Sequence, residues 1–209
     1  MKFWLFDILA CPICKHFPLT FYIISYEHKE ETFRRFIESY QQKETASYKK
    51  NQIPEIIKHE NNQIFIKDHI VIQETPLKAY LDKVISSIME LHHVVDNSSL
   101  SSSKLCLDLL RNDVKKKIDD FRNIPNYENI ENILPELNFL NKIKIEIEIK
   151  TGILFCNKCN RWYPIIDSIP RMLPDEYRNK TEETQFLEDN KSNLSKEFVN
   201  KDLKPFNLN

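Results

Sequence analysis

Two pairs of cysteines lie near opposite ends of this 209-residue chain, and each pair has the spacing of a metal knuckle. Cys11 and Cys14 form the first pair, and Cys156 and Cys159 form the second. Two residues inside each pair let the backbone turn so that both thiolates point at one ion, and four thiolates are typical of structural zinc. We therefore predict that one Zn²⁺ ion binds all four cysteines and joins the two ends of the sequence.

The sequence between the two pairs is interpreted as an insertion. Because the entropic cost of closing a loop rises only slowly with its length, a long insertion between metal ligands is physically tolerable. The fifth cysteine, Cys106, lies among leucines in a helical pattern. We interpret it as a core or edge thiol outside the metal site.

The single glycine, Gly152, argues against several kinds of enzyme. Dinucleotide-binding turns, phosphate-binding loops and nucleophile elbows need several glycines, because their backbone turns tightly or approaches a ligand closely. We therefore do not expect a self-sufficient nucleotide- or S-adenosylmethionine-binding enzyme of the glycine-rich kind. The net charge of −1, from 30 basic and 31 acidic residues, gives no overall attraction to nucleic acid.

The cysteines and the N-terminus indicate a cellular location. Five cysteines, of which four form two such pairs and one stands alone, are typical of a protein in a reducing compartment. In that compartment such pairs bind metal or do redox work. The apolar stretch from Met1 to Ala10 is interrupted by Asp7 and is followed directly by a cysteine pair, unlike a cleaved leader. No apolar run reaches the roughly 20 residues of a membrane-spanning helix. We expect a cytoplasmic protein, with the nucleus as a second location in a eukaryotic cell.

Strands are expected beside the cysteine pairs. Residues 2–10 indicate a short strand or turn, and the β-branched and aromatic residues of 19–26 predict a strand. Residues 143–150 alternate isoleucine with charged side chains, which predicts a strand with four isoleucines on one face. Gly152 is expected to turn the chain into the second knuckle.

Helices are expected in the insertion. Apolar residues at helical spacing predict helices over 28–44, 75–95, 103–122 and 127–142. Short strands are expected at 64–66 and 70–72, with a turn at 61–62. Beyond Pro174 the chain is rich in Asn, Lys and Glu, so we expect a helix at most over 181–189 and disorder after it.

The segment after Cys159 carries more apolar side chains than a knuckle of this size can bury. They pack on the N-terminal residues and the isoleucine strand, or they form a face that binds another protein, and both interpretations are open at this point. The candidate partner-binding residues are Phe3, Trp4, Leu5, Leu9, Trp162, Ile165, Ile166, Ile169, Pro170, Met172 and Leu173. An extended edge in this region would also allow a strand to be added to a partner's sheet.

Two blocks of the sequence resemble a known family. The first block, Leu9 to Cys14, has the pattern L-x-C-x-x-C. The second block, Gly152 to Pro174, contains Arg161-Trp162-Tyr163-Pro164-Ile165 and Ile169-Pro170-Arg171-Met172-Leu173-Pro174. Together they resemble the small zinc-binding activator subunit of methyltransferases, the tRNA methyltransferase 112 type, to which the short bacterial zinc-knuckle proteins are related. Ser168 stands where these relatives often carry glycine, and the insertion is longer than expected for the family.

The resemblance implies an α+β fold in which a zinc-knuckle domain with a small antiparallel sheet is joined to an inserted, mainly helical domain. On this sequence the zinc-binding domain would comprise residues 1–26 and 143–176. The helical domain would occupy 27–142, and 177–209 would form a charged, partly disordered tail.

The resemblance implies a regulatory subunit without catalysis of its own. Such subunits bind class I S-adenosylmethionine-dependent methyltransferases as heterodimers, with several alternative partners. The enzymes methylate tRNA, rRNA or peptide-chain release factor, so the subunit serves translation. The subunit itself would contact RNA only indirectly or weakly.

Two other functions stay open from the residues alone. A stand-alone zinc-ribbon protein would bind RNA by stacking bases on Arg161, Trp162 and Tyr163. A dithiol oxidoreductase would use one of the cysteine pairs, which tightly bound zinc would prevent. The basic cluster at 115–117 is flanked by acidic residues, and we interpret it as a solvated helix surface rather than an RNA contact.

Overall fold

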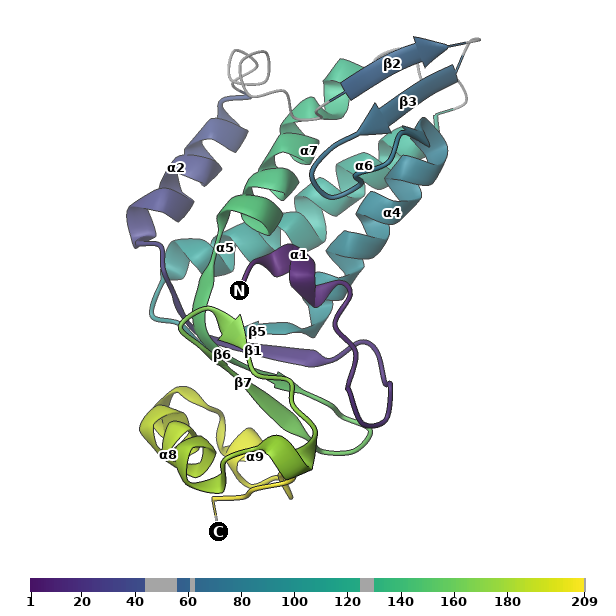
Figure 1. Cartoon of the computed structure of the whole chain (residues 1–209). Coiled ribbons are helices and arrows are strands. Elements are labelled where there is room, and N and C mark those ends of the chain that lie inside the picture. The colour runs from purple at the N-terminus through teal and green to yellow at the C-terminus, as the bar shows by residue number, and fades with distance from the viewer. Residues whose placement is uncertain (44–55, 61–62, 125–129, 209) are drawn as a thin grey trace. The chain divides into compact units, whose positions relative to one another are not determined.

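The structure is a computed structural model that describes residues 1–43, 56–60, 63–124 and 130–208 (Figure 1). The chain divides into two compact units, and each unit draws on separate stretches of the sequence. The cysteine unit, which holds both cysteine pairs, consists of Met1–Glu27, His93–Ser99 and Glu148–Asn209. The helical unit consists of His28–His92 and Leu100–Ile147.

The cysteine unit is built on a five-stranded sheet. Its strands are β1 (Thr20–Tyr26), β5 (Val94–Asp96), β6 (Ile149–Phe155), β7 (Trp162–Ile166) and β8 (Ile169–Pro170). Their order in the sheet is β5-β1-β6-β7-β8, in which β5 runs parallel to β1 and the other neighbours are antiparallel. The predicted α+β class and the small antiparallel sheet are confirmed. The parallel strand β5 comes from residues that the sequence assigned to the end of a helix.

One face of this sheet packs against the N-terminal residues. These residues form a one-turn helix, α1 (Phe3–Phe6), where the sequence indicated a strand or turn. The rings of Phe3 and Phe6 lie 6.2 and 5.4 Å from the ring of Phe21 on β1. The backbone of Met1 pairs with Ile149, which fixes the start of α1 beside the start of β6.

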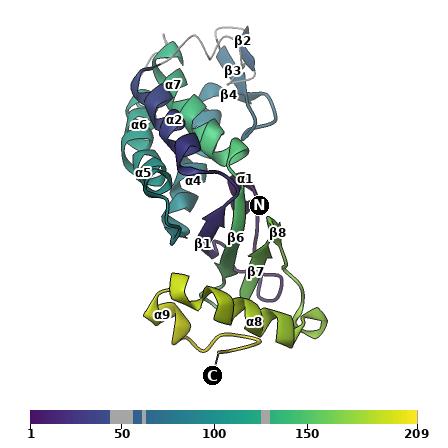
Figure 2. The same ribbon diagram turned by 90° about the vertical axis from the view of Figure 1, so that its left-hand side faces the viewer.

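The opposite face of the sheet is covered by the C-terminal segment (Figure 2). The helices α8 (Lys180–Asn190) and α9 (Lys196–Val199) lie on the side away from α1. The buried cluster between sheet and helices comprises Ile24, Ile153, Phe155, Trp162, Phe186, Leu187, Leu194, Phe198 and Leu203. The expected helix over 181–189 is confirmed. The disorder expected after it is wrong, because Leu194, Phe198 and Leu203 supply the apolar contacts that hold the segment on the sheet.

Gly152 lies inside strand β6, and it does not make the turn that the sequence predicted. A Cβ atom at this position would lie 2.8 Å from the carbonyl oxygen of Tyr22 and 3.0 Å from Cε2 of Phe21. Glycine is therefore present because β1 and β6 approach each other closely, and not because the backbone needs a left-handed conformation.

The helical unit contains the helices that the apolar spacing predicted. They are α2 (Glu30–Gln41), α4 (Leu77–Glu90), α5 (Ser101–Leu109), α6 (Lys115–Arg122) and α7 (Leu134–Asn141). A π-helical segment, η2 (Leu110–Val114), joins α5 to α6. A small sheet of β2 (Ile56–Glu60), β3 (Gln63–Lys67) and β4 (Thr75–Pro76) packs on α4. The expected turn at 61–62, and the expected beginning of a helix at 127, lie outside the described residues.

The strand expected at 70–72 does not form, and Asp68 explains why. Its carboxylate accepts hydrogen bonds from the backbone N–H groups of Ile70 (2.9 Å) and Val71 (2.6 Å), which ends β3 in a local turn. The same buried carboxylate accepts from the hydroxyl of Tyr80 (2.6 Å) and the amide of Asn141 (2.9 Å). Four donors thus satisfy one buried charge, which ties this loop to α4 and α7.

The strand expected at 143–150 is wrong over its first half. Residues Lys142–Glu146 form a π-helical segment, η4, and β6 begins only at Ile149. Ile143 and Ile147, four residues apart, are both buried, whereas Ile145 between them is only half-buried. Alternating isoleucines thus also fit a helical turn, and tertiary packing selected the helix here.

We predict that Gly152→Ala lowers the free energy of unfolding by about 1–3 kcal/mol, because the added methyl group overlaps the backbone of β1. Urea denaturation of the zinc-loaded protein measures this change. Thr151→Ala, one residue earlier on the same strand, is the matched control and should cost less than about 1 kcal/mol. Equal effects of the two substitutions would contradict the close approach of β1 and β6.

Candidate metal centre

The two cysteine pairs are held by knuckles of the same geometry. In the first, the N–H of Cys11 donates to the carbonyl of His16 (3.0 Å), and that of Lys15 donates back to Cys11 (2.9 Å). In the second, Cys156 donates to Arg161 (2.8 Å), and Asn160 donates back to Cys156 (2.9 Å).

The residue after each knuckle's second cysteine also has the same backbone conformation. Lys15 has φ of 58° and Asn160 has φ of 57°. Both therefore adopt the left-handed conformation, which non-glycine residues seldom take outside tight turns. Two segments far apart in the sequence thus present their cysteines in the same way.

The four sulfur atoms gather in one cluster. All four lie within 4.8 Å of one another, with Cys11 Sγ 3.6 Å from Cys159 Sγ and Cys14 Sγ 3.4 Å from Cys156 Sγ. A tetrahedral zinc ion with Zn–S bonds of about 2.3 Å separates its sulfurs by roughly 3.8 Å, close to these distances. A disulfide, at about 2.05 Å, would be far shorter. The donor set therefore fits one structural zinc ion, bound by two cysteines from each end of the chain.

The protein environment treats the thiols differently. Burial raises the pKa of Cys156 to about 12 in the absence of metal. Burial also acts on Cys11, but hydrogen bonds from the backbone of Cys14 and the hydroxyl of Tyr163 outweigh it and lower its pKa to about 7. The thiol of Cys11 is thus more easily converted than that of Cys156 to the thiolate that a metal requires.

Two side chains from the second knuckle support the cluster. The hydroxyl of Tyr163 lies 3.3 Å from Cys11 Sγ, and burial, followed by this contact, raises the pKa of Tyr163 so that its proton is retained. The guanidinium of Arg161 hydrogen-bonds Asp175, and its interactions with Asp175 and, to a smaller extent, with Cys159 raise its pKa. Donors of this kind orient ligand sulfurs and stabilise their charge.

The predicted partner-binding residues fall into two groups. Phe3, Trp162 and Ile165 are fully buried in the core of the cysteine unit. Trp4, Ile169 and Leu173 are exposed, and Leu5, Leu9, Ile166, Pro170 and Met172 are half-buried. Only the second group offers side-chain surface to another protein, so the first group is better explained by packing within the chain.

Two exposed apolar residues were not among the named candidate partner-binding residues. Ile8 follows α1, and Tyr177 ends the short helical turn Asp175–Tyr177, and both side chains are largely exposed. Ile8 belongs to the apolar N-terminal stretch, so its neighbours Leu5 and Leu9 were an available signal. Tyr177 stands in charged sequence, and no pattern marked it.

The basic cluster at 115–117 is part of an ion-pair network in the helical unit. Lys115 pairs with Asp119 (2.6 Å), and Lys117 contacts Asp113 (3.0 Å) and Glu136 (3.1 Å). Because these lysines already have acidic partners, the solvated-surface interpretation accounts for them.

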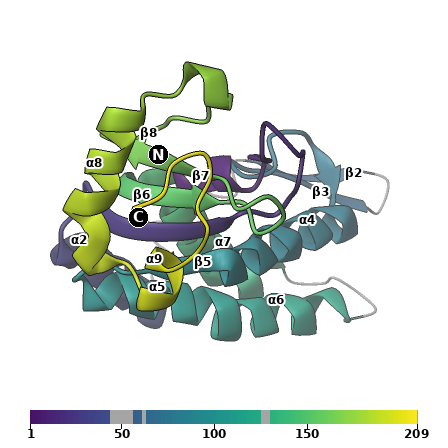
Figure 3. The same ribbon diagram turned by 90° about the horizontal axis from the view of Figure 1, so that it is seen from below.

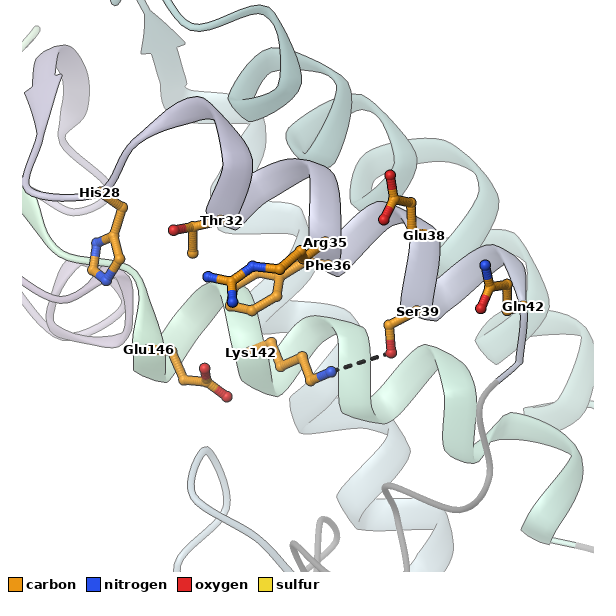
Figure 4. A pocket seen from close by; sticks show the side chains of 9 residues that line it. All are labelled: His28, Thr32, Arg35, Phe36, Glu38, Ser39, Gln42, Lys142 and Glu146. Atoms are coloured by element: carbon orange, nitrogen blue, oxygen red, sulfur yellow. Dashed lines mark hydrogen bonds between the residues drawn. The ribbon is translucent and has the colours of Figure 1, made fainter.

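A hollow of about 590 Å³ lies between α2 and η4 in the helical unit (Figure 4). Its lining residues are His28, Thr32, Arg35, Phe36, Glu38, Ser39, Gln42, Lys142 and Glu146. Lys142 donates to Ser39 Oγ (3.3 Å) and lies over the ring of Phe36. Two carboxylates balance Arg35 and Lys142, so the charges of the lining favour no class of ligand, and we assign none.

Comparison with known proteins supports the metal-centre interpretation. The family model described as Trm112p-like protein matches residues 2–168, a range that contains both cysteine pairs and the whole helical unit. No curated protein and no solved structure matches the chain. No helix among the described residues is long and apolar enough to cross a membrane.

We predict that zinc affinity increases with pH. Each thiol must lose its proton when zinc binds, and Cys156, with a pKa of about 12, is almost fully protonated near neutral pH. Raising the pH removes this competition, so the dissociation constant for zinc should fall at least about tenfold per pH unit between about pH 6 and pH 8. Competition with a chelator of known affinity measures it, and a constant affinity would contradict the four-thiolate site.

Cys156→Ser and Cys106→Ala form a matched pair for the same experiment. Cys106 is a buried thiol in α5, outside the cluster. Its substitution should leave one zinc per chain, whereas Cys156→Ser should lose tight binding.

Proposed function

This chain belongs to the Trm112p-like protein family, and from that premise we propose that it is a non-catalytic subunit that binds and activates methyltransferases. The family supports methyltransferase activation in general. The finer proposal is that the partners are class I S-adenosylmethionine-dependent enzymes that methylate tRNA, rRNA or peptide-chain release factor. The complex would be a heterodimer in the cytoplasm, with RNA contacted mainly by the enzyme.

One observation carries the proposal: two segments that bear exposed apolar residues are both hydrogen-bonded to the start of β6. The N-terminal ammonium of Met1 donates to the carbonyl of Ile149 (2.6 Å), and the N–H of Ser168 donates to Lys150 (2.9 Å). The first bond fixes α1 and the second fixes the β7–β8 turn. Because Ile149 and Lys150 are consecutive, we infer that these segments form one docking face. It comprises Trp4, Ile8, Ile169, Met172 and Leu173.

The sheet edge beside this face adds a second means of binding. β8 is the terminal strand of the order β5-β1-β6-β7-β8, and Ile169 on it is 64% exposed. An unpaired edge can accept a strand from another protein through backbone hydrogen bonds, while neighbouring side chains give specificity. We propose that the partner enzyme pairs with this edge and buries the apolar face.

Activation follows from thermodynamic linkage. A subunit that binds only the folded enzyme stabilises it, by about 2.7 kcal/mol when its concentration is 100 times the dissociation constant. By covering apolar surface of the enzyme, the subunit would hold the enzyme's cofactor-binding loops in their competent conformation. The zinc centre contributes no chemistry to the reaction, since four protein thiolates leave no position for a substrate.

The alternative of a stand-alone RNA-binding zinc ribbon receives less support. It requires Trp162 and Tyr163 to stack on bases, but both side chains are buried in the cysteine unit. Arg161 is engaged by Asp175 in a bidentate ion pair. These residues are therefore committed to the fold of the second knuckle.

Native mass spectrometry of the protein purified from its own cells tests the proposed function. The expected species is a complex of this chain, one zinc ion and a methyltransferase. A zinc-bound monomer that binds tRNA in a salt-dependent manner would favour the RNA-binding alternative instead.

We predict that Ile169→Asp and Leu173→Asp each weaken binding to the copurified methyltransferase by about 30-fold or more, because each places a charge in a desolvated apolar contact. Isothermal titration of the purified subunits measures the loss, and zinc content should stay at one per chain. Ile72→Asp is the control, since Ile72 is 72% exposed but belongs to the helical unit. Unchanged binding by both variants would place the interface elsewhere.

A further inference from the structure

The C-terminal segment, residues 175–206, contacts the second cysteine knuckle at three places. This segment lies beyond residue 168, where the family match ends. It crosses the sheet and returns to the knuckle (Figure 3). Each contact involves a residue within four positions of Cys159, and each is independent of the docking face proposed above.

The first contact is an ion pair that reaches a metal ligand through one arginine. Asp175 accepts hydrogen bonds from Arg161 Nε (3.0 Å) and Nη2 (2.8 Å). The same guanidinium interacts electrostatically with the thiol of Cys159, two residues earlier in the chain. Asp175 thus fixes the orientation of a cation that acts on a ligand sulfur, and fixing such neighbouring groups is the role of outer-shell residues in metal sites.

The second contact is a buried charge placed against the aromatic residues of β7. Arg178 is fully buried, pairs with Glu183, and lies 5.2 Å from the ring centres of both Trp162 and Tyr163. The hydroxyl of Tyr163 in turn lies 3.3 Å from Cys11 Sγ. The guanidinium therefore packs on the ring that positions a donor for the other cysteine pair.

The third contact extends the sheet. The N–H of Lys204 donates to the carbonyl of Asn160 (2.9 Å), and the N–H of Trp162 donates to the carbonyl of Lys204 (3.2 Å). The indole N–H of Trp162 also donates to the carbonyl of Phe206 (3.0 Å). Lys204 thereby forms a bridge beside Arg161 and secures the backbone directly after the knuckle.

From these contacts we propose that residues 175–206 are a built-in clamp on the metal centre, so that docking of the segment and retention of zinc are coupled. The segment holds Arg161, Tyr163 and the backbone of Asn160 in the arrangement that the four thiolates need. Coupling is reciprocal at equilibrium: if the docked segment raises the affinity for zinc, bound zinc must also favour docking of the segment. The clamp requires zinc but no methyltransferase, so it can be tested independently of the proposed function.

Asp175→Asn tests whether a contact of the C-terminal segment slows the loss of zinc. It removes the charge that holds Arg161 while keeping a similar shape. Transfer of zinc from the variant to a chromophoric chelator in excess should be about tenfold faster than from the wild type. Glu182→Gln is the matched control: it removes the exposed ion pair between Glu182 and Arg171 in the same region, and should leave the rate unchanged. Equal rates for the wild type and both variants would overturn the proposal.

Hydrogen exchange of the wild-type protein tests whether bound zinc stabilises the docking of residues 175–206. Removal of zinc by a chelator should accelerate exchange at the amides of Trp162 and Lys204 more than at amides in the β1–β6 ladder. Equal acceleration throughout the cysteine unit would mean that zinc supports only the global fold, and unchanged protection would mean no coupling. Either outcome would refute the clamp.

Discussion

The fold of the cysteine unit depends on the meeting of four sulfurs from opposite ends of the chain. Joining Cys14 to Cys156 closes a loop of 141 residues (15–155), and loop-closure entropy for this length costs about 4 kcal/mol. Structural zinc sites contribute roughly 10–16 kcal/mol, which exceeds that cost several-fold. A large helical unit can therefore lie between the ligand pairs. The chain even returns to the cysteine unit at His93–Ser99 to add strand β5 before completing the helical unit.

The sheet connects the metal centre to the rest of its unit. β1 begins six residues after Cys14, β6 ends immediately before Cys156, and β7 begins three residues after Cys159. The pairing of Thr20 with Phe155 and of Phe155 with Trp162 therefore sets the separation of the two knuckles. The close approach of β1 and β6 at Gly152 therefore matters for the metal centre. The register between these two strands also sets the position of the first cysteine pair relative to the second.

The sequence allowed the metal ligands, the main helices and the strand at 19–26 to be predicted, because each depends on local spacing. The features that the sequence did not reveal depend on contacts between elements that are distant in the sequence. The isoleucines at 143 and 147 suit either a strand or a helix, and burial decided between them. The short strand β5 forms only because β1 offers it an edge. In the candidate partner face, exposure separated Ile169 and Leu173 from Trp162 and Ile165, a distinction that hydrophobicity alone does not make.

The C-terminal segment shows how a charged sequence can form part of a core. Its apolar residues are sparse, so burial alone would allow several placements on the sheet. A buried charge pair restricts that choice: Arg178 and Glu183 are costly to bury unless they pair with each other, and Arg178 then lies against the rings of Trp162 and Tyr163. Misplacement by a single residue would leave a charge buried without a partner, at several kcal/mol. The pair thus specifies one register for the segment, and that register brings Asp175 to Arg161 and Lys204 to Asn160, beside the metal centre.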